Sequence, residues 1–375
     1  MDVAELLIHT KDRGGSDLHL SAGSLPLMRL HGQLTPIEDH ALTRDEVHKM
    51  VYEILNDDQR RVFEEQRDLD FAIEVGEHAR FRVNVFNQRN GEGAVFRVIP
   101  TQIRSFQELG LPDVMQTLAL RENGLVLVTG PTGSGKSTTL AAMIDLVNST
   151  QKKHIITLED PIEFVHRSKG CLMNQREIGS HTKSFAAALR AALREDPDVI
   201  LVGETRDLET AQISVRAALT GHLVFTTLHT NDCPSTVARM IDMGIPPFLL
   251  SSALLIILAQ RLGRRICKDC KQPVEGREED LVRYGHVPQG RGTVTLYRGA
   301  GCATCNGTGM KGRVAIYEVM PISEEIRDMI LKDASTAELR EQAQREGMKT
   351  LRQAGMAKVL EGVTTVEEVL RVTLG

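Results

Sequence analysis

The sequence predicts an α/β protein preceded by a smaller α+β domain, and three observations lead to this prediction. Residues 124–137, GLVLVTGPTGSGKS, place a short apolar run before a glycine-rich loop. Strand-like and helix-like patterns alternate after residue 113, which is typical of layered α/β folds. Two Cys-x-x-Cys pairs follow further along the chain. At 375 residues the chain is also too long for one small core, so we expect two domains.

Composition excludes several classes of protein. Hydrophobic residues make up 41% of the chain and charged residues 25%, which is ordinary for a globular protein. The net charge of −5 gives no overall basic surface, so nucleic acid is not an expected partner. The longest apolar run, 246–259, is interrupted by two serines and is too short to cross a membrane. The opening MDVAELLIHTKDRGG lacks the layout of a signal peptide, so we expect a cytoplasmic protein.

The first hundred residues predict the α+β domain. A capping box of Thr43 and Glu46 is expected to begin its second helix. The last two strands are expected to join through residues 90–93, NGEG. Residues 100–112 show no strong period, so we expect a first domain at 1–104, a linker at 105–112 and a second domain at 113–375. The predicted helix and strands outside the capped helix are 2–11, 16–20, 27–30, 71–75, 80–86 and 94–98.

The glycine-rich loop is the most specific motif, because it reads G-x-x-x-x-G-K-S between an apolar strand and a helix at 138–147. Its glycines allow backbone N–H groups to turn inward around a polyphosphate, and the helix N-terminus favours the same anion. Lys136 is expected to contact the β/γ-phosphates, and the Ser137 hydroxyl to ligate Mg²⁺. The predicted nucleotide-binding residues are Gly130, Pro131, Thr132, Gly133, Ser134, Gly135, Lys136, Ser137 and Thr138.

Acidic residues follow two of the later predicted strands. The apolar strand at 199–202 leads to Glu204, which is expected to hold Mg²⁺ at the carboxyl end of the sheet. The strand at 154–158 leads to 159–163, EDPIE, where one carboxylate is expected to orient or activate the attacking water. A solvated acidic turn is the alternative for this second segment. The remaining predicted elements of the second domain are 184–194, 208–219, 223–228, 323–332, 335–346, 351–361 and 365–372.

Two histidines flank the predicted strand 223–228. The spacing of His222 and His229 places them on opposite faces of a regular strand, so they need not share a role. Each is either an ordinary core or turn residue, or a sensor of the γ-phosphate or of a neighbouring subunit.

Four motifs, TGPTGSGKSTTL, TLEDPIEF, REDPDVILVGETRDLET and TGHLVFTTLHTND, resemble those of the secretion ATPases of type II secretion and type IV pilus systems. The resemblance covers nearly the whole chain. It implies a RecA-like P-loop ATPase core behind a PAS-like α+β domain, a ring-shaped hexamer, and ATP bound between the two domains. It also implies that Glu163 polarises water, that Glu204 is the Walker B acid, and that His222 and His229 are the histidines of the His box.

The same resemblance implies arginines that complete the site, since the transferring phosphoryl group calls for guanidinium donors. A surface salt bridge is the alternative for any one of them. The matching residues are Arg82, Arg97, Arg190, Arg194 and Arg206.

The cysteines predict a zinc module at 265–315. Cys267, Cys270, Cys302 and Cys305 form two Cys-x-x-Cys pairs, the arrangement of a closed and therefore structural Cys₄ zinc site. The polar, glycine-rich segment between the pairs builds no core of its own, so a metal would replace it. Four reduced thiols held by packing, or a redox pair, are the alternatives. Helices are expected to fill the C-terminal part, 321–375.

The resemblance is mixed between branches of the family. The first domain resembles that of pilus retraction ATPases, whereas the tetracysteine segment and the C-terminal part resemble the assembly and type II secretion branch. It implies a hexameric motor at the cytoplasmic face of the inner membrane that works through a membrane platform protein in twitching motility. A type II pseudopilus ATPase, a RecA-like nucleic-acid motor of conjugation, a non-hydrolysing regulatory subunit and a shortened form of a longer assembly ATPase are the alternatives.

Overall fold

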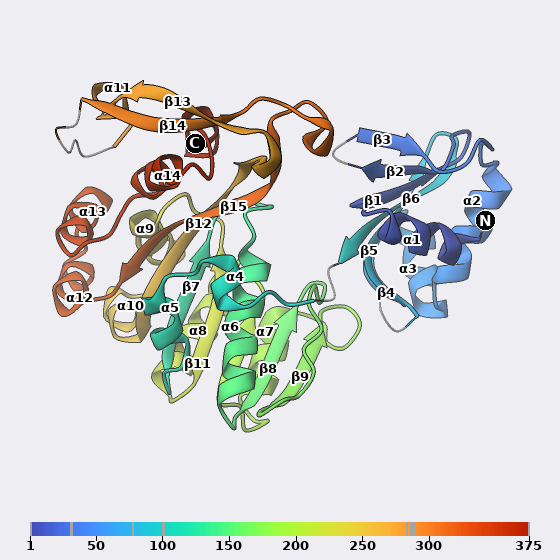
Figure 1. Ribbon diagram of the computed structural model, residues 1–375. Helices are drawn as coiled ribbons and strands as arrows, with labels where there is room; N and C mark the ends of the chain where they lie inside the picture. Colours follow the sequence, from blue (N-terminus) through green and yellow to red (C-terminus); the bar gives the residue numbers. More distant parts are fainter. Residues whose placement is uncertain are drawn as a thin grey trace. The chain divides into compact units, whose positions relative to one another are not determined.

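The computed structural model describes residues 2–30, 33–76, 79–99, 102–282, 284–285, 290 and 292–373. The chain divides into two compact units (Figure 1). Met1–Ile103 and Pro161–Val165 form the first unit, and Arg104–Asp160 and His166–Gly375 form the second. Residues 100 and 101 of the region in which we place the domain boundary lie outside the described residues.

The first unit is an antiparallel sheet with helices. Its strands pair in the order β3-β2-β1-β6-β5-β4. Alternate residues of β5, among them Phe81, Val83 and Val85, are fully buried, so one face of the sheet carries the core. Its elements are α1 (Val3–Asp12), β1 (Asp17–Ser21), β2 (Leu27–Leu30), β3 (Gln33–Pro36), α2 (Arg44–Ile54), α3 (Asp57–Gln66), β4 (Asp68–Val75), β5 (Ala79–Gln88) and β6 (Gly91–Ile99).

The turn predicted at 90–93 is wrong, because the connection lies at 89–90. Gln88 pairs with Gly91, so only Arg89 and Asn90 connect β5 to β6. Gly93 lies within β6 directly opposite Phe86, and a Cβ added there would lie 2.8 Å from the Phe86 ring. This glycine therefore makes room for an aromatic side chain across the strand pair, and does not form a turn.

The second unit is built on a seven-stranded sheet in the order β15-β12-β7-β11-β10-β8-β9. The pairs from β12 to β9 are parallel, and only β15 runs antiparallel to its neighbour β12. Its strands are β7 (Gly124–Thr129), β8 (His154–Glu159), β9 (Leu172–Glu177), β10 (Val199–Val202), β11 (Leu223–Leu228), β12 (Leu254–Ile266) and β15 (Met310–Pro321), with a separate hairpin of β13 (Lys271–Arg277) and β14 (Thr293–Gly299).

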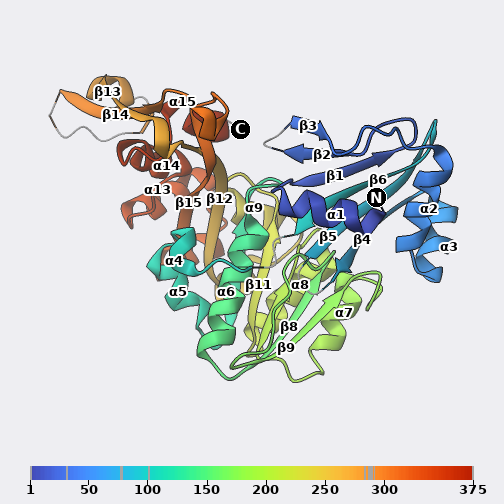
Figure 2. The same cartoon turned by 45° about the vertical axis from the view of Figure 1, so that its right-hand side comes forward.

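Helices cover both faces of this sheet, so β7 is buried on both sides. Val126 and Val128 face the layer of α4 to α6, seen together in Figure 2, and Leu125 and Leu127 face the layer of α7 to α10 and the C-terminal helices. The helices are α4 (Phe106–Leu109), α5 (Asp113–Ala119), α6 (Lys136–Thr150), α7 (Phe185–Ala192), α8 (Leu208–Leu219), α9 (Cys233–Asp242), α10 (Pro247–Ala253), α11 (Glu278–Val282), α12 (Glu324–Leu331), α13 (Thr336–Arg345), α14 (Leu351–Leu360) and α15 (Val366–Thr373).

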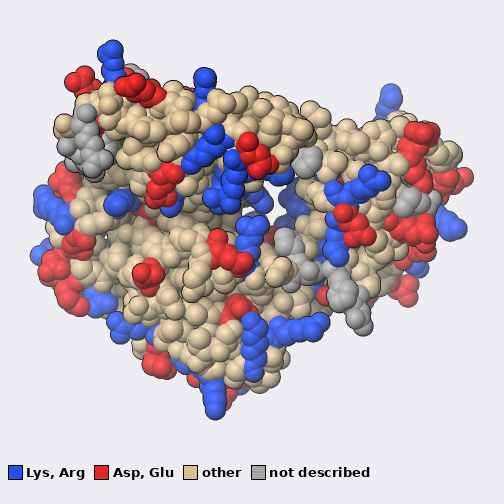
Figure 3. All heavy atoms as spheres, viewed as in Figure 1, with Lys and Arg blue, Asp and Glu red and all other residues tan. Residues whose placement is uncertain are grey.

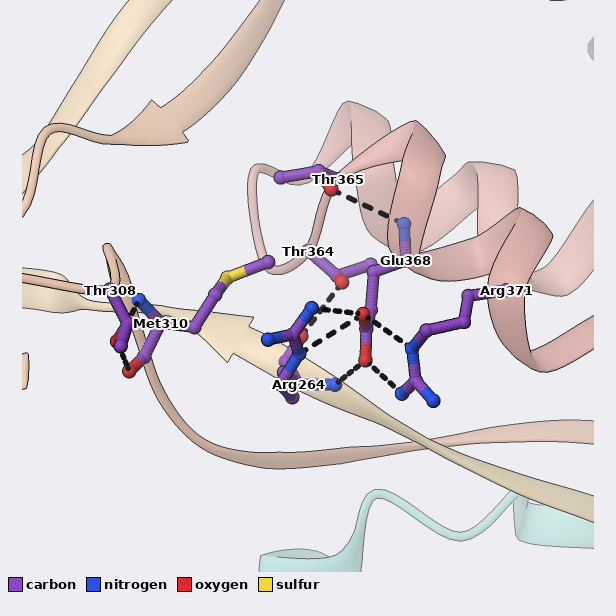
Figure 4. Close-up of polar contacts among 7 residues, drawn as sticks. All are labelled: Arg264, Thr308, Met310, Thr364, Thr365, Glu368 and Arg371. Carbon is purple, nitrogen blue, oxygen red and sulfur yellow. Dashed lines mark hydrogen bonds and ion pairs between the residues drawn. The ribbon is translucent and has the colours of Figure 1, made fainter. Parts of the chain in front are cut away.

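The last helix is attached to the long strand β12 by a buried carboxylate (Figure 4). Glu368 of α15 is 2% exposed and accepts hydrogen bonds from the Arg264 backbone N–H (2.7 Å) and guanidinium and from the Arg371 guanidinium. Thr364 Oγ1 also donates to the Arg264 carbonyl at 2.8 Å. We call Arg264, Glu368 and Arg371 the C-terminal clamp.

The segment predicted as a linker and the longest apolar run both contain regular secondary structure. The segment 105–112 contains α4, which Ser105 and Glu108 cap at its N-terminus. The apolar run 246–259 is divided between α10 and the start of β12. Among the described residues, no helix has the length and apolar character that crossing a membrane requires. Acidic and basic side chains are interspersed over the face drawn in Figure 3.

Candidate functional site

The glycine-rich loop lies between the end of β7 and the start of α6. Gly130, Gly133 and Gly135 have φ values of +148°, +77° and +92°, a region that other residues rarely adopt. A Cβ on Gly130 would also lie 2.5 Å from the backbone oxygen of Gln260. The loop therefore takes a tight turn that its glycines make accessible, and it delivers the chain to the N-terminus of α6, where anions are favoured.

Lys136 lies at this helix N-terminus with its ammonium group folded over the loop. Its Nζ donates to the carbonyl oxygens of Gly130 at 2.8 Å and of Pro131 at 3.1 Å. Thr132, Gly133 and Ser137 are exposed, so a ligand can reach the loop and the first turn of α6. The arrangement combines backbone N–H donors, a helix dipole and a cation, the elements that bind a polyphosphate.

Glu204 and His229 follow the neighbouring strands β10 and β11 at the same edge of the sheet. Glu204 Oε1 lies 2.7 Å from Arg206 Nε, and Glu204 Oε2 lies 3.7 Å from His229 Nε2. Burial and the positive charge of Lys136 lower the pKa of His229, although Glu204 opposes them. His229 is therefore neutral at neutral pH and offers one donor and one acceptor. The structure thus brings Lys136, Glu204, Arg206 and His229 together.

The first and last carboxylates of the EDPIE segment, Glu159 and Glu163, belong to different units. Glu159 Oε1 accepts hydrogen bonds from Thr157 Oγ1 at 2.6 Å and from Gln175 Nε2 at 3.1 Å, so it is engaged within the sheet. Glu163 belongs to the first unit, where its Oε1 lies 3.9 Å from Arg82 Nη1.

The arginines of the first unit are paired with acids of their own sheet. Arg82 Nε donates to Asp70 Oδ2 at 3.0 Å, and Arg97 Nε donates to Asp17 Oδ1 at 2.9 Å. Burial opposes ionisation of Asp17, but hydrogen bonds from Ser16 and Arg97 lower its pKa.

Three other predicted residues lie on α7, just after α7 and just before β11. Arg190 of α7 is exposed and pairs with Glu209, and Arg194 is exposed just after α7. His222 precedes β11 whereas His229 follows it, so about six strand residues, or roughly 20 Å, separate them. His222 Nδ1 bonds the carbonyl of Ala217 at 3.0 Å, as a turn residue does.

Sequence reasoning missed the polar residues beneath the loop. Gln260 of β12 is 2% exposed and bonds both the loop and α6, as described below. Thr129 Oγ1 lies 2.6 Å from Thr230 Oγ1, which joins the end of β7 to the chain after His229. The sequence did offer one signal, because the apolar strand LLIILAQRL contains a glutamine and an arginine. A strand that only builds the core needs no polar side chain at such positions.

The four predicted zinc ligands come together in the second unit. The sulfur atoms of Cys267, Cys270, Cys302 and Cys305 all lie within 4.8 Å of one another. Three of the separations, Cys267 to Cys302, Cys270 to Cys305 and Cys302 to Cys305, are 3.8, 3.8 and 3.7 Å. A tetrahedron with Zn–S bonds of about 2.3 Å requires sulfur atoms about 3.8 Å apart, so these residues fit zinc.

Backbone N–H groups donate to two of the sulfur atoms, but the pKa values of these two thiols shift in opposite directions. Gly301 N–H donates to Cys270 Sγ at 3.3 Å, and Gly309 N–H donates to Cys305 Sγ at 3.2 Å. Desolvation and the neighbouring thiols raise the pKa of Cys270 to about 12, despite the hydrogen bond from Gly301. Desolvation opposes ionisation of Cys305, but the N–H groups of Cys302 and Gly309 outweigh it and lower the pKa of Cys305 to about 6. The cysteines outside the cluster, Cys171 and Cys233, are free and buried.

Comparison with known proteins shows what this chain is similar to. The model of a family described as "Type II/IV secretion system protein" matches residues 6–371. The type IV pilus retraction ATPase PilT of Pseudomonas aeruginosa is 52% identical over 272 residues, which cover 71% of this chain and 79% of that protein. The type IV pilus assembly ATPase PilB of Myxococcus xanthus is 46% identical over 302 residues, which cover 79% of this chain and 53% of that protein.

Two further proteins are also similar to this chain. The type II secretion system protein E of Pseudomonas aeruginosa is 43% identical over 305 residues, which cover 80% of this chain and 59% of that protein. A crystal structure of the pilus retraction motor PilT with bound ADP has a TM-score of 0.80 at 38% identity, covering 99% of this chain and 96% of that chain. The phosphate loop, the acid after β10 and the match over residues 6–371 together show that the chain belongs to the type II/IV secretion ATPase family and is an ATPase.

Proposed function

We propose that this chain forms a homohexameric ring that couples ATP hydrolysis to the assembly or retraction of a type IV pilus. The observation that supports this most is the meeting of Lys136, Glu204 and His229 at the ends of adjacent parallel strands. Open α/β sheets bind their ligands at this edge. The relatives named for pilus retraction and assembly supply the kind of work that hydrolysis would drive.

Each residue of the site has a proposed role. The loop N–H groups and Lys136 hold the β- and γ-phosphates. The exposed Ser137 hydroxyl and the Glu204 carboxylate are the oxygen ligands that Mg²⁺ prefers, and the ion would neutralise charge on the transferring phosphoryl group. Neutral His229 beside Glu204 is suited to sensing the γ-phosphate through a hydrogen bond.

Hydrolysis also needs a group that orients water and cations that offset the developing charge. We assign the first role to Glu163, which polarises the attacking water. Arg82, Arg97, Arg190, Arg194 and Arg206 are the candidates for the second role, and His222 is a candidate for contact with a neighbouring subunit. The salt bridges that hold Arg82, Arg97 and Arg190 would have to be exchanged for phosphate contacts during turnover.

The zinc module has a structural role in this proposal. The four cysteines would fill all four ligand positions of a tetrahedral Zn²⁺, so no position would remain open for chemistry. The protein itself would act at the cytoplasmic face of the inner membrane, bound there through a platform protein. No nucleic-acid partner is proposed, because the net charge is −5.

A second candidate function is the type II secretion pseudopilus ATPase, which the similarity to the type II secretion system protein E favours. Deletion and complementation in the source organism separate the candidates. Loss of a retraction motor should leave surface pili without twitching, loss of an assembly motor should remove the pili, and loss of a secretion ATPase should abolish protein release with pili intact. Pili, twitching and secretion all unchanged would contradict the proposal.

A further inference from the structure

One polar side chain in the second unit lies beneath the phosphate loop, and the roles assigned above do not include it. Gln260 stands in the middle of β12, the strand that pairs with β7, and is 2% exposed. A buried primary amide is costly unless both of its ends are hydrogen-bonded, so its partners indicate why it is there.

Both ends of this amide are satisfied, and its orientation is fixed. Gln260 Nε2 donates to the carbonyl oxygen of Ser134, inside the phosphate loop, at 2.8 Å. Thr139 Oγ1, in the first turns of α6, donates to Gln260 Oε1 at 2.7 Å. Because the Ser134 carbonyl can only accept a hydrogen bond, the amide nitrogen must face the loop and the amide oxygen must face Thr139.

The contact with Ser134 bears on how the loop binds phosphate. A phosphate loop directs its N–H groups toward the ligand, so its carbonyl oxygens must point away and find donors elsewhere. Gln260 supplies that donor for Ser134. The loop also rests directly on this residue, since a Cβ on Gly135 would lie 2.8 Å from Gln260 Nε2 and one on Gly130 would lie 2.5 Å from the Gln260 backbone oxygen.

We propose that Gln260 is a positioning residue for the phosphate loop, held in place by Thr139, and that it sets the affinity for the β- and γ-phosphates of MgATP. The proposal deepens the function proposed above and rests on ATP binding at the same loop. Gln260 is buried and contacts the loop through Ser134, so its effect on a bound ligand would be transmitted through the Ser134 peptide.

The test measures MgATP binding by calorimetry and the KM and kcat of hydrolysis in single and paired variants. Gln260→Leu should weaken MgATP binding and raise KM about tenfold, because a buried carbonyl loses its donor. Thr139→Val should weaken binding by several-fold, whereas Thr139→Ser, which keeps the hydroxyl, should bind as the wild type does. The double variant should be no worse than Gln260→Leu alone, because Thr139 acts through Gln260.

A buried hydroxyl elsewhere in the second unit provides the control. Ser214 Oγ donates to the Thr210 carbonyl within α8 at 2.8 Å, so Ser214→Ala should lower the melting temperature slightly and leave KM unchanged. The proposal would be overturned if the Gln260→Leu variant had the melting temperature of Ser214→Ala and kept the wild-type KM. If Gln260→Leu does not fold, Thr139→Val with an unchanged KM overturns it instead. Wild-type protein that does not bind MgATP would refute the proposed function itself, which is a distinguishable result.

Discussion

Replacing Glu368 by glutamine tests how the C-terminal clamp attaches α15 to β12. The carboxylate accepts the Arg264 backbone N–H at 2.7 Å, Arg264 Nη2 at 2.9 Å and Arg371 Nε at 2.9 Å (Figure 4). Glutamine keeps the shape of the side chain, but its amide group presents donors to two guanidinium groups that are themselves donors. The substitution therefore removes the charge and part of the hydrogen bonding without creating a cavity.

The structure bounds the size of the effect. Hydrogen bonds to charged groups contribute about 1.5–3 kcal/mol each in net terms. The Arg264 and Arg371 side chains are 56% and 57% exposed, so water can replace part of what they lose. We therefore expect α15 to lose about 2–3 kcal/mol of local stability, equivalent to a 30- to 150-fold increase in the population of its open state.

Hydrogen exchange of the amides in α15 measures this opening directly. The control is Glu367→Gln, which changes the same residue type one position earlier, where the side chain is exposed. Glu367→Gln should leave the exchange rates of α15 unchanged. Equal exchange in the two variants would refute the argument that the clamp holds this helix.

The clamp also predicts a pH dependence. Burial opposes ionisation of Glu368, but hydrogen bonds from Arg371 and Arg264 outweigh it and lower its pKa to about 2, from a usual value of 4.5. A carboxylate with a lowered pKa stabilises the folded state above its unfolded pKa, and that contribution is lost as pH falls from about 4.5 through about 2. The wild type should lose α15 protection across this range, and Glu368→Gln should show no such loss. A wild-type profile that matches the variant would contradict the assignment.

Two further predictions concern the proposed zinc site and Glu163, the residue proposed to polarise the attacking water. Chelation of zinc, or Cys302→Ser, should unfold residues 265–315 while MgATP binding persists, because structural zinc contributes about 10–16 kcal/mol in small modules. Metal content near zero by elemental analysis, in protein that is folded and active, would contradict the zinc site. Glu163→Gln should bind MgATP normally and lose turnover, since an amide cannot accept a proton. A fall in nucleotide affinity as large as the fall in turnover would instead make Glu163 a ligand.

Much of the second unit was predictable because its signals are local. The strands at 199–202 and 223–228 and the helix at 208–219 have the predicted bounds, since continuous apolar runs and a 3.6-residue period identify buried strands and helices. The four cysteines were predicted to meet because their paired spacing leaves few other arrangements. The sequence motifs likewise indicated that Lys136 and Glu204 would share one edge of the sheet.

The elements that were missed either have weak local signals or depend on tertiary contacts. Helix α3, DDQRRVFEEQ, contains only Val62 and Phe63 as apolar residues, so it shows no period, and the capping box of Asn56 and Gln59 defines its start. Gly93 resembles a turn residue until Phe86 is placed opposite it. Gln260 gave only the weak signal of a polar residue in an apolar strand, because its partners Ser134 and Thr139 lie more than one hundred positions away.

The central claim is that the phosphate loop is the site of ATP hydrolysis. Comparing MgATP hydrolysis by the purified wild type and by Lys136→Ala tests it most directly. Lys136→Ala should reduce turnover about 100-fold or more, because the loop loses the cation that offsets phosphate charge. Lys169→Ala is the matched control, since the Lys169 ammonium bonds Asp145 and Ser149 at the surface of the same unit, and this variant should retain turnover. Steady MgATP hydrolysis that disappears in Lys136→Ala alone is the predicted result. Wild-type turnover in Lys136→Ala would contradict the assignment of this loop as the site of ATP hydrolysis.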